Sequence, residues 1–146
     1  MSKTRLIITP LIISLILTLI IYFLFLILDL ITNFHTSDVL LNVDFIRNYE
    51  NMTLIEELSY HYLTTLIIVI LTIVIYVNYI NLKPLFFIIL LITFTILYPF
   101  LIKLSVRDMF EYTLNEHVIW IFGHMLFLYL LNTIMTSQCL RILVSK

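Results

Sequence analysis

Hydrophobic residues gather in four long stretches of this chain, and polar residues gather in the segments between them. The apolar stretches cover residues 6–28, 62–80, 85–102 and 118–135. Each is long enough to cross the hydrocarbon core of a bilayer, about 30 Å thick, as an α-helix that rises about 1.5 Å per residue. The pattern therefore predicts an all-α fold, an integral membrane four-helix bundle that forms a single domain over residues 1–146.

The lengths of the polar segments predict the path of the chain. Only the sequence NLKP, residues 81–84, separates the second and third stretches, so these two helices must form an antiparallel hairpin. The other two segments, residues 29–61 and 103–117, are longer loops on the opposite side of the membrane. In the third stretch Pro99 has no amide hydrogen, so we expect hydroxyl groups or neighbouring helices to bond the carbonyl group that it leaves free.

Composition and charge favour a membrane protein and predict its orientation. Hydrophobic residues make up 62% of the sequence and charged residues 12%, which leaves too few polar side chains to cover a water-facing exterior. Four crossings leave both termini and the NLKP turn on one side, whereas all nine acidic residues lie in the two longer loops. The positive-inside rule then predicts that both termini face the cytoplasm of a plasma membrane, or the matrix side of an organellar inner membrane. The basic residues on this side are Lys3, Arg5, Lys83, Arg141 and Lys146.

The first of the longer loops contains a further helical pattern. The sequence SDVLLNVDFIRNY, residues 37–49, offers Ser37 as an N-cap and places Val39, Val43 and Ile46 at helical spacing. We expect a short helix that lies in the membrane interface. It would serve either as a cover over the bundle or as a surface on which a partner docks.

The second and fourth apolar stretches are each preceded by a signal for the start of a helix. Thr53 with Glu56, and Thr113 with Glu116, both have the Thr-x-x-Glu spacing of a capping box. In such a box the threonine hydroxyl accepts from the amide of the glutamate, and the carboxylate reaches back to the amide of the threonine. We therefore assign these four residues a structural role in helix capping.

Four side chains near these helix starts are candidates for chemistry: Glu57, His61, His117 and His124. At about 100° per residue, Glu57 and His61 share one face of their helix, and His117 and His124 share one face of theirs. If the two faces meet, one carboxylate and three imidazoles converge near the outer surface, with His124 about 10 Å deeper than His117.

Ionisable groups at such depth are candidates for a functional site. A metal site, a quinone headgroup contact, a haem ligand or a proton relay would each use this cluster. In the structural alternative, His61 and His117 lie among interfacial aromatic residues, and His124 hydrogen-bonds to a neighbouring helix. The sequence identifies no particular cofactor.

The sequence favours a non-catalytic function. It contains no glycine-rich phosphate loop, cysteine pair or serine nucleophile elbow, and its few scattered basic residues argue against nucleic-acid binding. We expect a non-catalytic subunit or accessory protein of a larger membrane complex, whose partners are the lipid bilayer and other membrane-protein subunits. A small redox, metal-binding or proton-handling membrane protein that uses the Glu/His cluster is the alternative, and a small transporter or immunity-type protein is a third.

Overall fold

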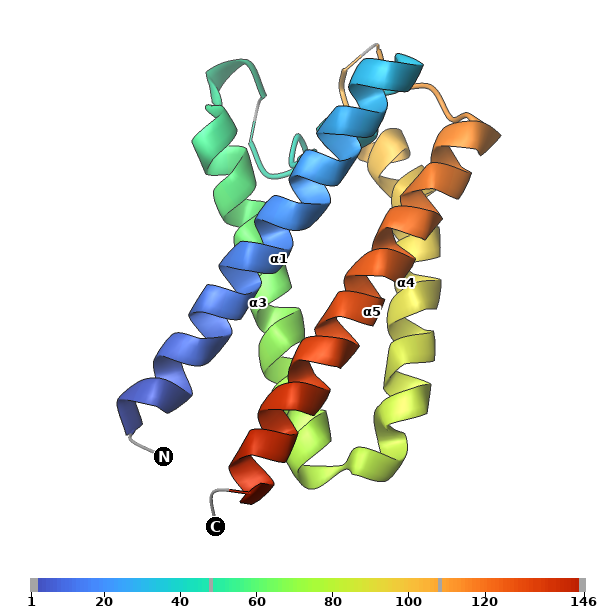
Figure 1. Ribbon diagram of the computed structural model, residues 1–146. Helices are drawn as coiled ribbons and strands as arrows, with labels where there is room; N and C mark the ends of the chain where they lie inside the picture. The colour runs from blue at the N-terminus through green and yellow to red at the C-terminus, as the bar shows by residue number, and fades with distance from the viewer. Residues whose placement is uncertain (1–2, 48, 108, 145–146) are drawn as a thin grey trace.

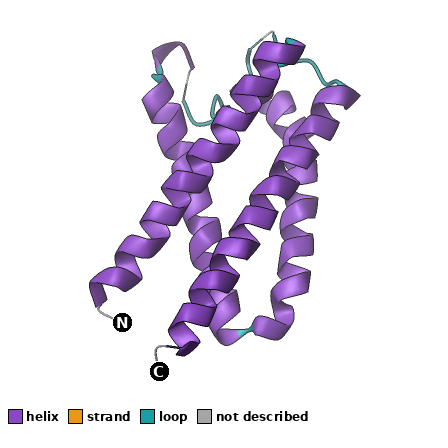
Figure 2. Ribbon diagram, viewed as in Figure 1, coloured by secondary structure: helices purple, strands orange, loops and turns teal. Residues whose placement is uncertain are grey.

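The computed structural model describes residues 3–47, 49–107 and 109–144 and is all-helical over these ranges, as the sequence predicts (Figure 2). Asp108 and Lys146, which enter the charge analysis, lie outside the described residues. Four helices are long and apolar enough to span a membrane. They are α1 (Lys3–Thr32), α3 (Leu54–Asn78), α4 (Lys83–Leu104) and α5 (Leu114–Val144). The short elements are α2 (Thr36–Leu40), η1 (Tyr49–Asn51) and η2 (Ile80–Leu82).

The long helices extend beyond the apolar stretches from which they were predicted. The helix α1 continues to Thr32 rather than ending at residue 28, and α3 begins at Leu54 rather than at residue 62. Charged residues interrupt the apolar stretches at these turns, Asp29 in α1 and Glu56 with Glu57 in α3, whereas the capping box at Thr53 predicts the start of α3 correctly. The two longer loops are correspondingly shorter than expected and cover residues 33–53 and 105–113.

The four long helices form two packed pairs (Figure 1). The helix α1 packs mainly against α3, α4 packs mainly against α5, and α1 also crosses α5. Although η2 joins α3 and α4 as the predicted hairpin, these two helices contact each other little. Both termini lie at the same end of the bundle as η2, which we call the turn end, and the two loops lie at the opposite loop end.

The contact between α1 and α5 depends on the only glycine of the sequence. A Cβ atom on Gly123 would collide with the ring of Phe25 and would lie 3.4 Å from the Cδ1 atom of Ile21. The Phe25 ring is fully buried and stacks on Trp120 of α5, with 5.6 Å between ring centroids and 6° between ring planes. A small residue at position 123 thus allows α1 to approach closely, in the manner of packed membrane helices.

The helix α2 is shorter than predicted, and the prediction that Ser37 caps it is wrong. Residue His35 stands at the N-cap without a side-chain hydrogen bond. Instead, one Asp29 carboxylate oxygen accepts from the Thr36 amide at 2.9 Å, and the other accepts from the Ser37 amide at 2.6 Å. This carboxylate at the end of α1 satisfies the free amides at the start of α2, because an anion is favourable at that position.

The side chains of α2 point into the protein. Both Val39 and Leu40 are buried, whereas Val43 and Ile46 lie beyond the end of the helix. Leu40 also contributes to a cavity inside the bundle. The helix therefore covers the loop end of the bundle, in agreement with the cover that the sequence suggests.

Candidate functional site

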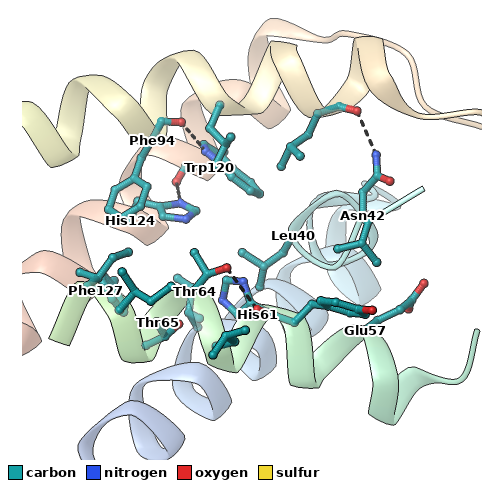
Figure 3. Close-up of a pocket in the computed structure, with 18 of the residues that line it drawn as sticks. Leu40, Asn42, Glu57, His61, Thr64, Thr65, Phe94, Trp120, His124 and Phe127 are labelled. Carbon is teal, nitrogen blue, oxygen red and sulfur yellow. Dashed lines mark hydrogen bonds between the residues drawn. The ribbon is translucent and has the colours of Figure 1, made fainter. Parts of the chain in front are cut away.

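A cavity of about 460 Å³ lies in the half of the bundle nearest the loop end. It occupies the space between α3 and α4, which diverge from the turn that joins them. Figure 3 shows Thr64 and His61 of α3 on one wall, with Trp120 and His124 of α5 on the opposite wall. The lining is mainly apolar and aromatic with a few polar groups, as is typical of a small-molecule site.

The hydrogen bond of His124 to its own helix fixes which of its ring nitrogens carries the proton. Its Nδ1 atom lies 2.9 Å from the carbonyl oxygen of Trp120, one turn earlier in α5. A carbonyl group can only accept, so Nδ1 carries the proton and donates, and Nε2 of the neutral ring is an acceptor. The ring packs between Phe94 and Trp120, with centroid separations of 4.5 and 4.3 Å. His124 is thus held rigidly at the cavity wall.

The second histidine of the cavity, His61, has an unused polar atom. Its Nε2 atom is buried and has no hydrogen-bond partner among the described residues. More than about 90% of buried polar groups in proteins have such a partner, so each exception needs an explanation. The ring of His61 lines the same cavity as His124.

The third histidine of the predicted cluster, His117, has a different environment. Its Nε2 atom donates to the carbonyl oxygen of Thr95 at 2.9 Å, and the Tyr112 hydroxyl lies 3.0 Å from its Nδ1 atom. The Thr95 carbonyl is the one that Pro99, four residues later, leaves without a helical partner. His117 therefore satisfies the carbonyl that the sequence predicted to be free. It does not line the cavity.

The two predicted helix starts differ in how their glutamates are used. At Thr53 both hydrogen bonds of the capping box with Glu56 are present. At Thr113 the hydroxyl accepts from the Glu116 amide at 3.3 Å, but the Glu116 carboxylate accepts from the Tyr98 hydroxyl at 2.6 Å. Glu116 is buried, so its carboxylate joins α5 to α4 rather than completing the box.

The segment from α2 to Ile46 covers the loop end of the cavity, and we call it the cover. An ion cluster holds this cover in place. Arg107 donates to Glu57 at 2.6 Å, and through two nitrogens to Asp44 at 3.1 and 3.0 Å. The Asp44 side chain is fully buried and also accepts from the Ser105 hydroxyl at 2.6 Å. Burial lowers the pKa of Arg107, but the bonds to both carboxylates outweigh burial and hold that pKa above its ordinary value. The guanidinium therefore stays charged and joins both loops to α3.

The structure does not bring the four residues of the predicted Glu/His cluster together at one site. His61 and His124 share the cavity, Glu57 lines its edge but is engaged by Arg107, and His117 bonds to α4. Among the described residues, no three His, Cys, Asp or Glu side chains are placed to hold a metal ion. What the site offers is hydrogen bonding from two imidazoles inside an apolar cavity.

Comparison of the chain with protein-family models, with curated proteins and with solved structures finds no match.

Replacing Arg107 with glutamine should destabilise the protein far more than the same change at Arg47. Loss of Arg107 leaves the carboxylates of Asp44, which is fully buried, and Glu57, which is largely buried, without their counter-ion, which we expect to cost about 3 kcal/mol. Arg47 pairs with Glu56 at 3.1 Å on the exposed surface, so its loss should change stability little. The measurement is the free energy of unfolding in mixed detergent micelles, and equal losses in the two variants would contradict the assignment.

The role of His117 can be isolated in a double-mutant cycle with Pro99. His117→Phe keeps a ring against Tyr98 but removes the donor to Thr95, which should cost about 1–3 kcal/mol of unfolding free energy. In a Pro99→Ala background the alanine amide can bond the Thr95 carbonyl, so the same substitution should cost less. Equal costs in the two backgrounds would show that His117 does not act by satisfying that carbonyl.

Proposed function

We propose that this chain is an integral membrane protein that binds a small molecule in the cavity between α3 and α4. In this proposal His61 and His124 are the hydrogen-bonding groups that recognise it. The proposal develops the predicted Glu/His function and reduces it to the two histidines that share one cavity. The non-catalytic subunit of a larger membrane complex stays a prediction, as do the transporter and the immunity-type protein.

The outward faces of the long helices support insertion in a membrane. Large apolar side chains are exposed along them, for example Ile12 at 51%, Ile88 at 55% and Phe122 at 66%. Apolar surface of this extent is unfavourable in water and is accommodated by lipid chains. With five of the eight basic residues and none of the nine acidic residues on the side of the turn end, the orientation that we propose has both termini in the cytoplasm or matrix.

One observation carries the ligand-binding function. Two imidazole rings from different helices face a single apolar cavity, and the buried Nε2 atom of His61 lacks a partner among the described residues. Leaving a polar atom buried and unbonded costs about 1–3 kcal/mol, which a ligand with a hydrogen-bonding group would recover. The His124 ring is positioned by packing against Phe94 and Trp120 and by its bond to the Trp120 carbonyl oxygen, so this part of the site is formed before a ligand arrives.

The proposed orientation predicts which positions a membrane-impermeant thiol reagent reaches. After Cys139 is replaced with serine, Glu111→Cys at the loop end should be labelled in intact cells. Asn81→Cys at the turn end should be labelled only after the membrane is permeabilised, because both residues are exposed but lie at opposite ends of the bundle. Labelling of both from the same side would overturn the orientation.

Filling the cavity should remove a molecule that purifies with the protein. Ile68 lines the cavity, whereas Ile70 lies on the same helix, is 46% exposed and does not line it. Mass spectrometry of organic extracts should therefore find a bound molecule, above bulk lipid, with the wild type and with Ile70→Trp but not with Ile68→Trp. Identical extracts from all three folded proteins would contradict the proposed function.

A further inference from the structure

The cavity has an opening whose rim is apolar. On α3 the rim is formed by Leu63 and Ile67, which are 52% and 53% exposed. On the cover it is formed by Phe45 and Ile46, which are 53% and 54% exposed. Leu63 and Ile67 lie in the outer part of the apolar stretch 62–80, so in the proposed orientation this opening faces the hydrocarbon of the bilayer on the side of the loop end.

The loop end of the cavity, in contrast, is closed by the cover, which a hydrogen bond and an ion pair hold in place. Asn42 is buried and donates through Nδ2 to the Leu101 carbonyl oxygen at 2.9 Å, which fastens the cover to α4. Two residues later Asp44 is held by Arg107. A ligand that came from water would have to break these bonds, whereas one dissolved in the lipid would pass between α3 and α4.

The charges at the site favour a neutral headgroup. The only carboxylate among the described lining residues is that of Glu57, and Arg107 neutralises it at 2.6 Å. A charged headgroup would therefore be buried without a counter-ion, which is costly. The Nε2 atom of His124 is an acceptor in the neutral ring, so the group that it recognises must donate a hydrogen bond.

We propose that the ligand is a neutral, hydroxyl-bearing amphiphile that enters sideways from the bilayer. Its hydroxyl group donates to Nε2 of His124, His61 bonds the same headgroup, and its hydrocarbon tail passes over Leu63 and Ile67, between α3 and α4, into the lipid. This inference rests on the proposed function and names the class of ligand. Quinols and diacylglycerols share this chemistry, one with an aromatic and the other with an aliphatic hydroxyl.

The only tryptophan of the sequence gives a direct signal for binding. Trp120 is 1% exposed and lines the cavity, so its fluorescence reports on what fills the cavity. We would titrate the full chain in lipid nanodiscs with para-nonylphenol, with its methyl ether para-nonylanisole, and with phenol, which has no tail. The expected result is a saturable change for para-nonylphenol, with an affinity at least about ten-fold higher than for either of the other two compounds.

Two substitutions assign the recognition to His124. The variant His124→Phe keeps an aromatic ring beside Phe94 but has no acceptor, so it should bind para-nonylphenol and para-nonylanisole equally. The matched variant His117→Phe changes a histidine outside the cavity and should keep the preference of the wild type. Equal affinities of the wild type for the phenol and its ether, or for the phenols with and without a tail, would overturn the inference.

Competition separates failure of this inference from failure of the proposed function. Displacement of the co-purified molecule by para-nonylphenol or by dioctanoylglycerol supports the ligand class, and the more potent of the two indicates an aromatic or an aliphatic source. If decanoate, which is charged, displaces it and neither hydroxyl compound does, the ligand class is wrong and the binding function stands. If no molecule co-purifies and no probe changes the Trp120 fluorescence, both are wrong.

Discussion

Polar groups remote from water must find their partners within the chain, and this constraint accounts for most of the buried polar contacts in the bundle. The Thr95 carbonyl that Pro99 leaves free is bonded by His117. The buried Glu116 carboxylate is bonded by the Tyr98 hydroxyl. Against this background two buried polar atoms of the described residues are exceptions, the Thr18 hydroxyl and Nε2 of His61, and the ring of His61 lies where the packing leaves a cavity. The proposed function rests on this observation, because an imidazole with an unbonded nitrogen lines an unfilled cavity.

The cavity itself follows from how the four long helices pair. Close packing of α1 on α3, and of α4 on α5, leaves α3 and α4 with little contact beyond their shared turn. At the turn end Tyr76 of α3 donates to the Asn132 side chain of α5 at 2.5 Å, so the bundle is closed there. At the loop end Leu40 and the segment after it cover the space, and the pairing of Arg107 with Asp44 holds that cover. The cavity is thus closed at both ends of the bundle and remains open at the side.

The sequence predicts the fold better than it predicts the site. The number, order and approximate position of the long helices follow from apolar length, and the cap at Thr53 follows from local spacing. The free carbonyl produced by Pro99 is also predictable, but the donor that reaches it is on another helix and depends on packing. The hydrogen bonds of Asp29 to α2 and the ion pair of Arg107 with Asp44 could not be predicted from the sequence either, because local spacing does not identify partners that lie in other elements. Helical periodicity placed His117 and His124 on one face of their helix, yet only the packing of α4 shows that one is engaged and the other lines a cavity.

The central claim is that His61 and His124 present ring nitrogens to a ligand in a preformed cavity. Nitrogen NMR of the imidazole rings in lipid bicelles, with and without para-nonylphenol, tests this most directly. We predict the Nδ1-protonated form for His124 before addition, and on addition a shift of the Nε2 resonances of His61 and His124 while those of His117 stay unchanged. A His124 ring protonated only at Nε2, or resonances of His61 and His124 that do not respond, would contradict the account.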